Sequence, residues 1–190
     1  AIMCLCSGFA QISFEAQEHL IDRLLDEFKR WTPQRFHRLP LCMKDEEVQL
    51  LFYRKCFERD WISSEFILKW CSLLQKKGAS WETSEPYSPA WIMRNGCINR
   101  TVYGDIWFQW ARMETKQNGA GNYSIENTAR WIYREACLKH GADSGTWLKW
   151  AQLEVGENNV GSYETESTAR WIYREACLKH SANGAVWMGW

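Results

Sequence analysis

The chain has 190 residues, which is long enough for one ordinary domain or a short run of repeats with a sizeable buried core. Its 23 basic and 23 acidic residues give a formal net charge of zero, so bulk charge offers no attraction to nucleic acid or to an anionic membrane. A hydrophobic fraction of 46% with only 12 Gly and 4 Pro excludes a disordered or collagen-like chain. The 13 Trp residues outnumber Phe and Tyr, which indicates that one Trp-bearing motif has been copied.

The sequence also indicates whether the chain crosses a membrane and which cellular compartment it occupies. No run of about 18 uninterrupted apolar residues occurs, so we expect no transmembrane helix and no membrane partner. The chain opens AIMCLCSGFA, without an initiator Met or a complete signal peptide, which favours a fragment of a longer protein. Its eight Cys lack the spacing of a disulfide framework, which favours an intracellular, reducing compartment, either cytoplasm or nucleus.

The N-terminal segment, residues 1–47, differs in pattern from the rest of the chain. One helix is predicted from Phe14 to Trp31, because apolar residues recur among charged ones at Phe14, Leu20, Ile21, Leu24, Leu25 and Phe28. Thr32 and Pro33 then interrupt the helical pattern, and the stretch through Pro40 is expected to be irregular. We interpret residues 1–47 as an N-terminal helical cap or the end of a preceding domain.

A repeat with an offset of 40 residues occupies the rest of the chain. TARWIYREACLKH runs from Thr128 to His140 and recurs unchanged from Thr168 to His180, while IWFQWARME at 106–114 returns as TWLKWAQLE at 146–154. SPAWIMRNGCINR at 88–100 is a third version of the first string, and LLFYRKC at 50–56 with FILKWCSLL at 66–74 forms a degenerate copy. The predicted copies are 48–87 (degenerate), 88–127, 128–167 and 168–190 (truncated).

Each copy contains two amphipathic helical segments. In the longer one, apolar residues fall at steps of three and four, at Ala129, Ile132, Tyr133, Ala136 and Cys137. The shorter segment carries four recurring residues on one side of the helix, namely Trp147, Trp150, Ala151 and Glu154. Helix N-caps are predicted at Ser88, which precedes Pro89, and at the equivalent Thr128 and Thr168.

The pattern W-x-x-W-A-x-x-E followed by A-R-x-I-Y-x-x-A is similar to the half-a-TPR (HAT) repeat, a relative of the tetratricopeptide repeat. The resemblance covers roughly residues 50–190, and its matching residues are Trp147, Trp150, Ala151, Glu154, Ala169, Arg170, Ile172, Tyr173 and Ala176. It implies an all-α fold, a right-handed α-solenoid of stacked antiparallel helix pairs, here with a 40-residue period. HAT repeats are usually shorter, and the excess here lies in the loop between Glu154 and Thr168.

Residues that could carry chemistry recur at fixed repeat phase, which favours structural roles. Cys97, Cys137 and Cys177 fall on the apolar stripe and are expected in the core, while Cys4 and Cys6 form a C-x-C that supports a zinc site only weakly. His140 and His180 fall at a helix C-terminus, where the helix dipole favours a partly positive ring. Structural ion pairing is expected of the recurring charged residues Glu114, Glu154, Arg130 and Arg170.

Aromatic residues next to Arg, at Trp91, Trp131 and Trp171, could stack on bases, but packing between copies explains them without a ligand. The chain contains none of the G-x-x-x-x-G-K-[ST], G-x-G-x-x-G, H-E-x-x-H and G-x-S-x-G signatures. We therefore expect no enzyme activity, and we assign no catalytic, cofactor-binding or metal-binding residue.

Function is then expected on the surface that varies between copies. HAT proteins are mostly scaffolds in RNA-processing complexes, so the resemblance implies protein binding first, RNA binding second and no catalysis. In a solenoid the shorter helices line one face, whose outward residues here are Phe108, Gln109, Arg112, Leu148, Lys149 and Gln152, followed by Met188 and Gly189.

The leading hypothesis is a protein-interaction scaffold or sensor segment of a larger protein, binding a peptide or helix in the groove. Direct binding of single-stranded RNA is the alternative, and it is disfavoured by the neutral charge. Because the sequence stops at Trp190, inside the last copy, we also expect the parent to continue and this chain to self-associate or fray from residue 181 onward.

Overall fold

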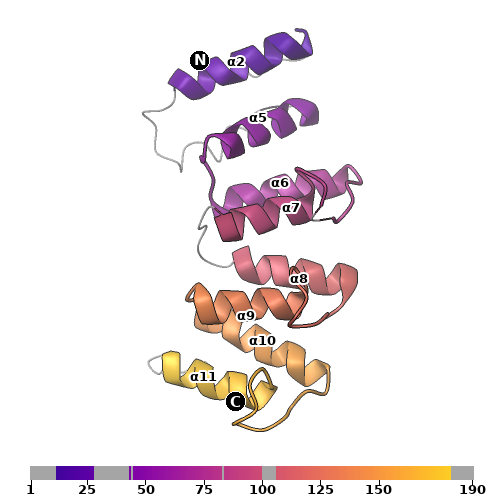
Figure 1. Ribbon diagram of the computed structural model, residues 1–190. Helices are drawn as coiled ribbons and strands as arrows, with labels where there is room; N and C mark the ends of the chain where they lie inside the picture. Colours follow the sequence, from indigo (N-terminus) through magenta and orange to yellow (C-terminus); the bar gives the residue numbers. More distant parts are fainter. Residues whose placement is uncertain (1–11, 28–42, 44, 83, 100–105, 181–190) are drawn as a thin grey trace. The chain divides into compact units, whose positions relative to one another are not determined.

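The computed structural model describes residues 12–27, 43, 45–82, 84–99 and 106–180, and every element in these residues is a helix (Figure 1). The chain divides into two compact units, unit 1 (Ala1–Val102) and unit 2 (Tyr103–Trp190), so the division falls inside the predicted copy 88–127. Unit 1 contains α2 (Phe14–Glu27), α5 (Glu46–Glu58), α6 (Ser64–Lys76), α7 (Pro89–Arg94) and η3 (Asn95–Asn99). Unit 2 contains α8 (Ile106–Asn118), α9 (Ala129–Lys139), α10 (Ser144–Gly156) and α11 (Ala169–Lys179). The predicted all-α class is confirmed.

The predicted N-terminal helix is present as α2, which packs on α5. Ile21 and Leu25 are fully buried, whereas Phe14 is 60% exposed and does not join the apolar face as expected. The remainder of the expected helix, from 28 to 31, and the stretch through Pro40 lie outside the described residues.

Charged side chains hold the edge of the contact between α2 and α5. Lys55 lies 2.6 Å from Glu18 and 3.3 Å from Asp22, and Arg59 lies 2.8 Å from Asp22. Partial burial alone would raise the pKa of Asp22, but hydrogen bonds from Arg59 and Lys55 outweigh it and hold that pKa below its usual value. The carboxylate therefore stays ionised and paired at neutral pH.

The degenerate copy forms α5 and α6, and aromatic rings fill the space between these helices. Tyr53 meets Phe66 edge-on with ring centres 4.7 Å apart, and Phe57 meets Trp70 edge-on at 5.5 Å. Burial raises the pKa of the Tyr53 hydroxyl to about 12. The two helical segments predicted at 50–56 and 66–74 both lie inside these helices.

The helix that follows Ser88 departs from regular α geometry after six residues. Ser88 caps it by accepting from the Trp91 backbone N–H at 3.2 Å, but α7 continues as the π-helical turn η3. The Asn95 side chain donates to the Trp91 carbonyl at 2.9 Å, which competes with the backbone ladder. A Cβ on the next residue, Gly96, would stand 2.3 Å from Ile67 Cδ1, so glycine permits close packing on α6.

In unit 2, helices adjacent in the sequence contact one another, and α8 also contacts α10. The predicted helix starts are present, with Thr128 accepting from the Trp131 backbone N–H at 3.4 Å. Thr168 also occupies the N-cap position of its helix, but its hydroxyl makes no capping bond. The Thr168 hydroxyl donates to the Ser162 and Thr165 carbonyls, at 2.8 and 2.7 Å, and so ties the preceding loop to the helix, as the Thr128 hydroxyl does through the Asn122 and Ile125 carbonyls.

The long loops that precede α9 and α11 return close to the helix N-termini. Gly121 and Gly161 have positive φ angles of 69° and 57°, and each touches the threonine that begins the next helix. A Cβ at Gly161 would stand 2.2 Å from Thr168 Cγ2. These two positions therefore need glycine for both the backbone angle and the space.

Replacing Gly161 with Ala should lower the free energy of unfolding by about 1 to 3 kcal/mol, because the left-handed angle is strained and the methyl group displaces Thr168. The matched control is Gly156→Ala, since Gly156 ends α10 with open space around it. This control should be neutral or stabilising by up to about 1 kcal/mol. Chemical denaturation of both variants checks the pair, and equal midpoints would contradict the assigned contact.

None of the helices in the described parts of the chain combines the length and the apolar character needed to cross a bilayer.

Candidate interaction surface

The predicted interaction face lies on α8 and α10. Arg112, Lys149 and Gln152 are exposed, whereas the other three members are half-buried, namely Phe108, Gln109 and Leu148. Lys149 donates to the Gln152 side chain at 3.1 Å. The two sets of residues lie on helices of unit 2 that contact each other, while Met188 and Gly189 lie outside the described residues. We call the six described residues the α8/α10 face.

Buried tryptophans fix the helices that carry this face. Trp110, Trp147 and Trp150 are fully buried, and Trp107 is nearly so. Within each helix the two rings lie 5.7 Å apart, and Trp110 and Trp150 meet the half-buried Trp131 and Trp171 edge-on. These last two rings pack against the protein, as the sequence indicated.

Basic groups cover the first Trp of each helix. The His140 ring stacks on Trp107 with ring centres 4.7 Å apart, and Lys179 Nζ lies 5.1 Å from the centre of the Trp147 ring. His140 and His180 both occupy the C-cap position of their helices, where they were predicted. The His140 imidazole is therefore part of the helix packing around Trp107.

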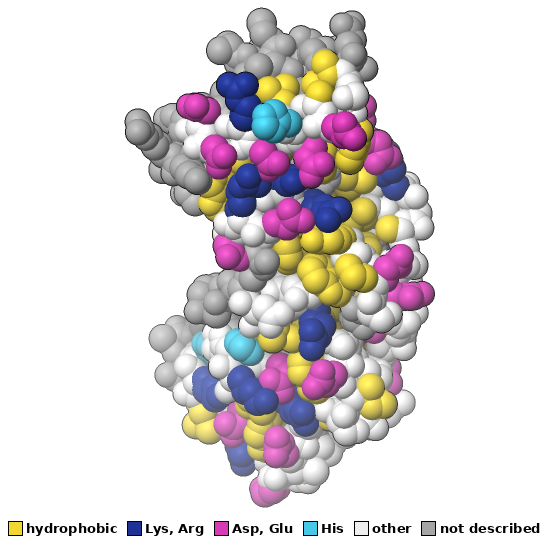
Figure 2. Space-filling view, turned by 45° about the horizontal axis from the view of Figure 1, so that its top comes forward, with side chains coloured by type: hydrophobic (Ala, Val, Ile, Leu, Met, Phe, Trp, Pro, Cys, Tyr) yellow, Lys and Arg dark blue, Asp and Glu magenta, His cyan; other side chains and the backbone are white. Residues whose placement is uncertain are grey.

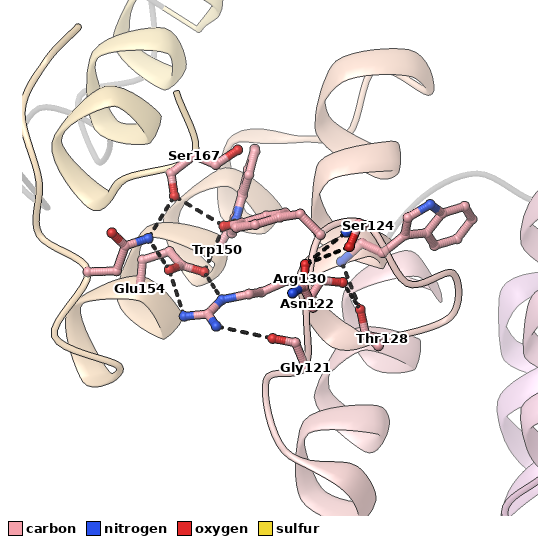
Figure 3. A network of polar contacts seen from close by, with 11 residues as sticks. Gly121, Asn122, Ser124, Thr128, Arg130, Trp150, Glu154 and Ser167 are labelled. Atoms are coloured by element: carbon pink, nitrogen blue, oxygen red, sulfur yellow. Dashed lines mark hydrogen bonds and ion pairs between the residues drawn. The ribbon is translucent and has the colours of Figure 1, made fainter. Parts of the chain in front are cut away.

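A buried carboxylate joins three segments of unit 2 (Figure 3). Glu154 on α10 is fully buried and receives Arg130 of α9 in a two-pronged pair, from Nε at 2.8 Å and Nη2 at 3.0 Å. The Tyr123 hydroxyl and the Asn159 amide also donate to Glu154, at 2.7 and 2.6 Å. The predicted ion pairing is present for Arg130 and Glu154, and the carboxylate is satisfied from several sides.

The same network reaches Trp150 and the two long loops. Trp150 Nε1 donates to the Tyr123 hydroxyl oxygen at 2.8 Å, and Asn159 also donates to the Ser167 carbonyl at 3.1 Å. Arg130 Nη1 donates to the Gly121 carbonyl at 3.1 Å, so its guanidinium lies between that loop and Glu154 (Figure 3). Burial, and then the hydrogen bond to Glu154, raise the pKa of Tyr123 above its ordinary value, so its hydroxyl stays a donor.

Sequence reasoning missed the roles of Tyr123, Asn159 and Gly121. Tyr123 and Gly121 do recur at an offset of 40 residues, as Tyr163 and Gly161. That recurrence inside a loop was the available signal, because loop residues without a shared contact have no reason to be kept in phase. Asn159 has no such signal, since Gly119 stands at the equivalent position. Glu114, the equivalent of Glu154 one copy earlier, accepts a hydrogen bond from the Asn118 side-chain amide at 2.6 Å.

The recurring cysteines lie in the core as predicted. Cys97, Cys137 and Cys177 are buried free thiols. Burial raises the pKa of each, so the thiols stay protonated and unreactive near neutral pH. Cys4 and Cys6 lie outside the described residues, and within the described ranges no three His, Cys, Asp or Glu side chains are grouped to hold a metal ion.

Surface charge is mixed. Figure 2 shows Lys and Arg side chains interspersed with Asp and Glu on the face in view. Several surface charges of the described residues are paired, as Lys69 is with Glu65 at 2.6 Å and Arg54 with Glu58 at 2.9 Å. Among the described residues on the face in view, no continuous basic stripe of the kind that tracks a nucleic-acid backbone is present.

Comparison with known proteins returned no match to a protein-family model, to a curated protein or to a solved structure.

Proposed function

We propose that this chain is a protein-interaction scaffold or sensor segment of a larger protein, built as a HAT/TPR-like, right-handed α-solenoid with a 40-residue period. Contacts between consecutive helices within each unit support the stacked arrangement. Backbone geometry recurs at the same period, because Tyr87, Asn127 and Ser167 all have positive φ angles immediately before a helix N-cap. A larger assembly in RNA processing, or a multidomain regulator, suits a segment of this kind.

One observation carries the proposal of binding. Between α8 and α10, the buried framework is identical at Trp107 and Trp147, Trp110 and Trp150, and Glu114 and Glu154. At the α8/α10 face the residue changes at every equivalent position, from Phe108, Gln109 and Arg112 to Leu148, Lys149 and Gln152. A fixed frame that presents different side chains from copy to copy suits recognition of an extended partner, such as a peptide or a helix.

The proposal predicts that helical peptides selected against the full chain from a randomised amphipathic library will bind at the α8/α10 face. Exchanging Lys149 and Gln152 together for Glu should weaken the selected peptides by about tenfold or more, because the change reverses local charge on exposed side chains. Fluorescence anisotropy with labelled peptides measures the loss.

The control for this experiment is Gln117→Glu, since Gln117 is exposed on α8 and lies outside the arc of the helix that carries Phe108, Gln109 and Arg112. It changes the net charge in the same direction and should leave peptide affinity within about twofold. Peptides that bind equally well to all three proteins would show that the interaction surface lies elsewhere.

Single-stranded RNA should bind weakly, with a dissociation constant above about 1 µM at physiological salt, because the chain has zero net charge and interspersed surface charges. Anisotropy with a labelled RNA of mixed sequence measures this. Submicromolar binding with a steep salt dependence would favour the alternative, an RNA-binding helical-repeat protein.

A further inference from the structure

The exposed charge on α8 and α10 is entirely positive, although the chain as a whole is neutral. Each of these two helices has a single carboxylate, Glu114 or Glu154, and both carboxylates are buried. The other charged residues of the two helices are all exposed, namely Arg112, Lys116 and Lys149. A neutral total therefore hides a positive surface on these helices of unit 2.

Arg112 and Lys116 form a like-charge pair on one side of α8. They stand four residues apart, and Phe108 stands four residues before Arg112, so the three side chains follow one row along the helix. We call Phe108, Arg112 and Lys116 the basic row. Neither cation has a carboxylate partner among the residues that the structure describes, whereas on α9 Lys139 pairs with Glu135 at 2.9 Å. Adjacent like charges destabilise a helix, so this arrangement works against α8 unless a negative partner is bound.

The positive surface continues on α10, which contacts α8. Lys149 is exposed and donates to the neutral Gln152 side chain at 3.1 Å, and no carboxylate of the described residues pairs with it. Leu148 stands beside Lys149 and is half-buried, as Phe108 is on α8. Half-buried apolar side chains next to unpaired cations are complementary to a partner that offers apolar and acidic side chains together.

The spacing of the basic row indicates the form of that partner. Every element in the described residues is a helix, so these residues offer no sheet edge that an extended peptide could join. Side chains at steps of four lie along one side of a helix, and a second helix laid along α8 presents its own side chains at the same intervals. The row therefore suits a helix better than an extended segment.

We propose that the basic row binds an acidic amphipathic helix of a partner protein. An apolar residue of that helix meets Phe108, and two carboxylates, spaced at further steps of about four residues, pair with Arg112 and Lys116. Lys149 adds positive potential that favours approach of the acidic helix. The inference rests on the proposed function, because Phe108 and Arg112 belong to the α8/α10 face, and it names the chemistry of the partner.

The test uses three fluorescein-labelled peptides that differ only at the two charged positions. Each peptide is a lactam-bridged helix with one apolar stripe, and the two positions hold Glu, Gln or Lys. Anisotropy with the full chain should give the Glu peptide an affinity about tenfold above that of the Gln peptide, and the Lys peptide should bind most weakly. Salt at about 1 M should remove most of this difference, because ions screen exposed charges.

Variants of the full chain locate the binding. Arg112→Gln with Lys116→Gln should bring the Glu and Gln peptides within about twofold of each other and leave affinity for the Gln peptide unchanged. The matched control, Lys139→Gln with Arg174→Gln, removes the same charge from cations that pair with a Glu of their own helix, and it should keep the preference. Arg112→Glu with Lys116→Glu should make the Lys peptide the tightest binder, a reversal that misfolding does not produce.

Four results would overturn the inference. Equal affinity for the three peptides is one, and if the variant with Lys149 and Gln152 both changed to Glu still weakens them, the proposed function stands. A preference for Glu that survives Arg112→Gln with Lys116→Gln is another, because the cations responsible then lie elsewhere. Absence of binding by all three peptides is the third, and peptides selected from the randomised library then decide the proposed function separately. Displacement of the Glu peptide by RNA of mixed sequence below about 1 µM is the fourth, and it would favour nucleic acid as the occupant.

Discussion

Replacing Trp150 with Ala should lower the free energy of unfolding by about 3 to 5 kcal/mol, the usual cost of deleting a large side chain from a packed core. The ring is fully buried, meets Trp147 and Trp171, and donates a hydrogen bond to Tyr123. Removing it leaves a cavity between α10 and α11 and takes one donor from the hydroxyl network. Thermal and chemical denaturation, followed by far-UV circular dichroism, measure the loss.

Two further variants make this result specific. Trp150→Phe keeps most of the apolar volume but loses the bond to Tyr123, so its cost should fall between zero and that of Trp150→Ala. Leu178→Ala changes a side chain that is 69% exposed and should stay within about 0.5 kcal/mol of the parent. An unchanged melting temperature for Trp150→Ala would place this face of α10 outside the core.

The helices could be predicted from sequence because each one buries a single face. Apolar spacing at Ile132, Ala136 and Cys137 indicated α9, and the residues with that spacing are buried. The Ser88 and Thr128 caps could also be predicted, since a hydroxyl before an apolar periodic segment has a local reason to cap.

Features that depend on tertiary contacts could not be predicted in this way. The π-turn at Asn95 accompanies close packing of Gly96 on Ile67, a residue 29 positions earlier in the chain. Thr168 makes the same bonds to its preceding loop as Thr128 but lacks the capping bond, a difference that the identical helix sequences could not predict. Pairing of Arg130 with Glu154 was expected from repeat phase, but the loop residues that complete the site meet Glu154 only once α10 is packed.

Replacing Glu154 with Leu should cost about 3 kcal/mol, because it leaves the partly buried Arg130 guanidinium without its carboxylate and takes from the Tyr123 hydroxyl the nearer of its two acceptors. Leucine is the informative substitution, since the chain itself carries Leu74 at the same repeat phase in unit 1. The loss arises mainly from the abandoned partners and only slightly from volume. Denaturation at neutral pH measures it, and Trp fluorescence reports whether the surroundings of Trp150 have opened.

A double-mutant cycle tests whether the loss of stability comes from breaking the Arg130–Glu154 ion pair. Arg130→Ala combined with Glu154→Leu removes both charges, and Ala90 stands at the phase of Arg130 one copy earlier, so the framework accepts a small residue there. Because no abandoned guanidinium remains, the double variant should be more stable than Glu154→Leu alone by about 1 kcal/mol or more. Additive losses in the cycle would show that Arg130 and Glu154 contribute independently. The buried carboxylate would then stabilise α10 through Tyr123 and Asn159 and not through its ion pair.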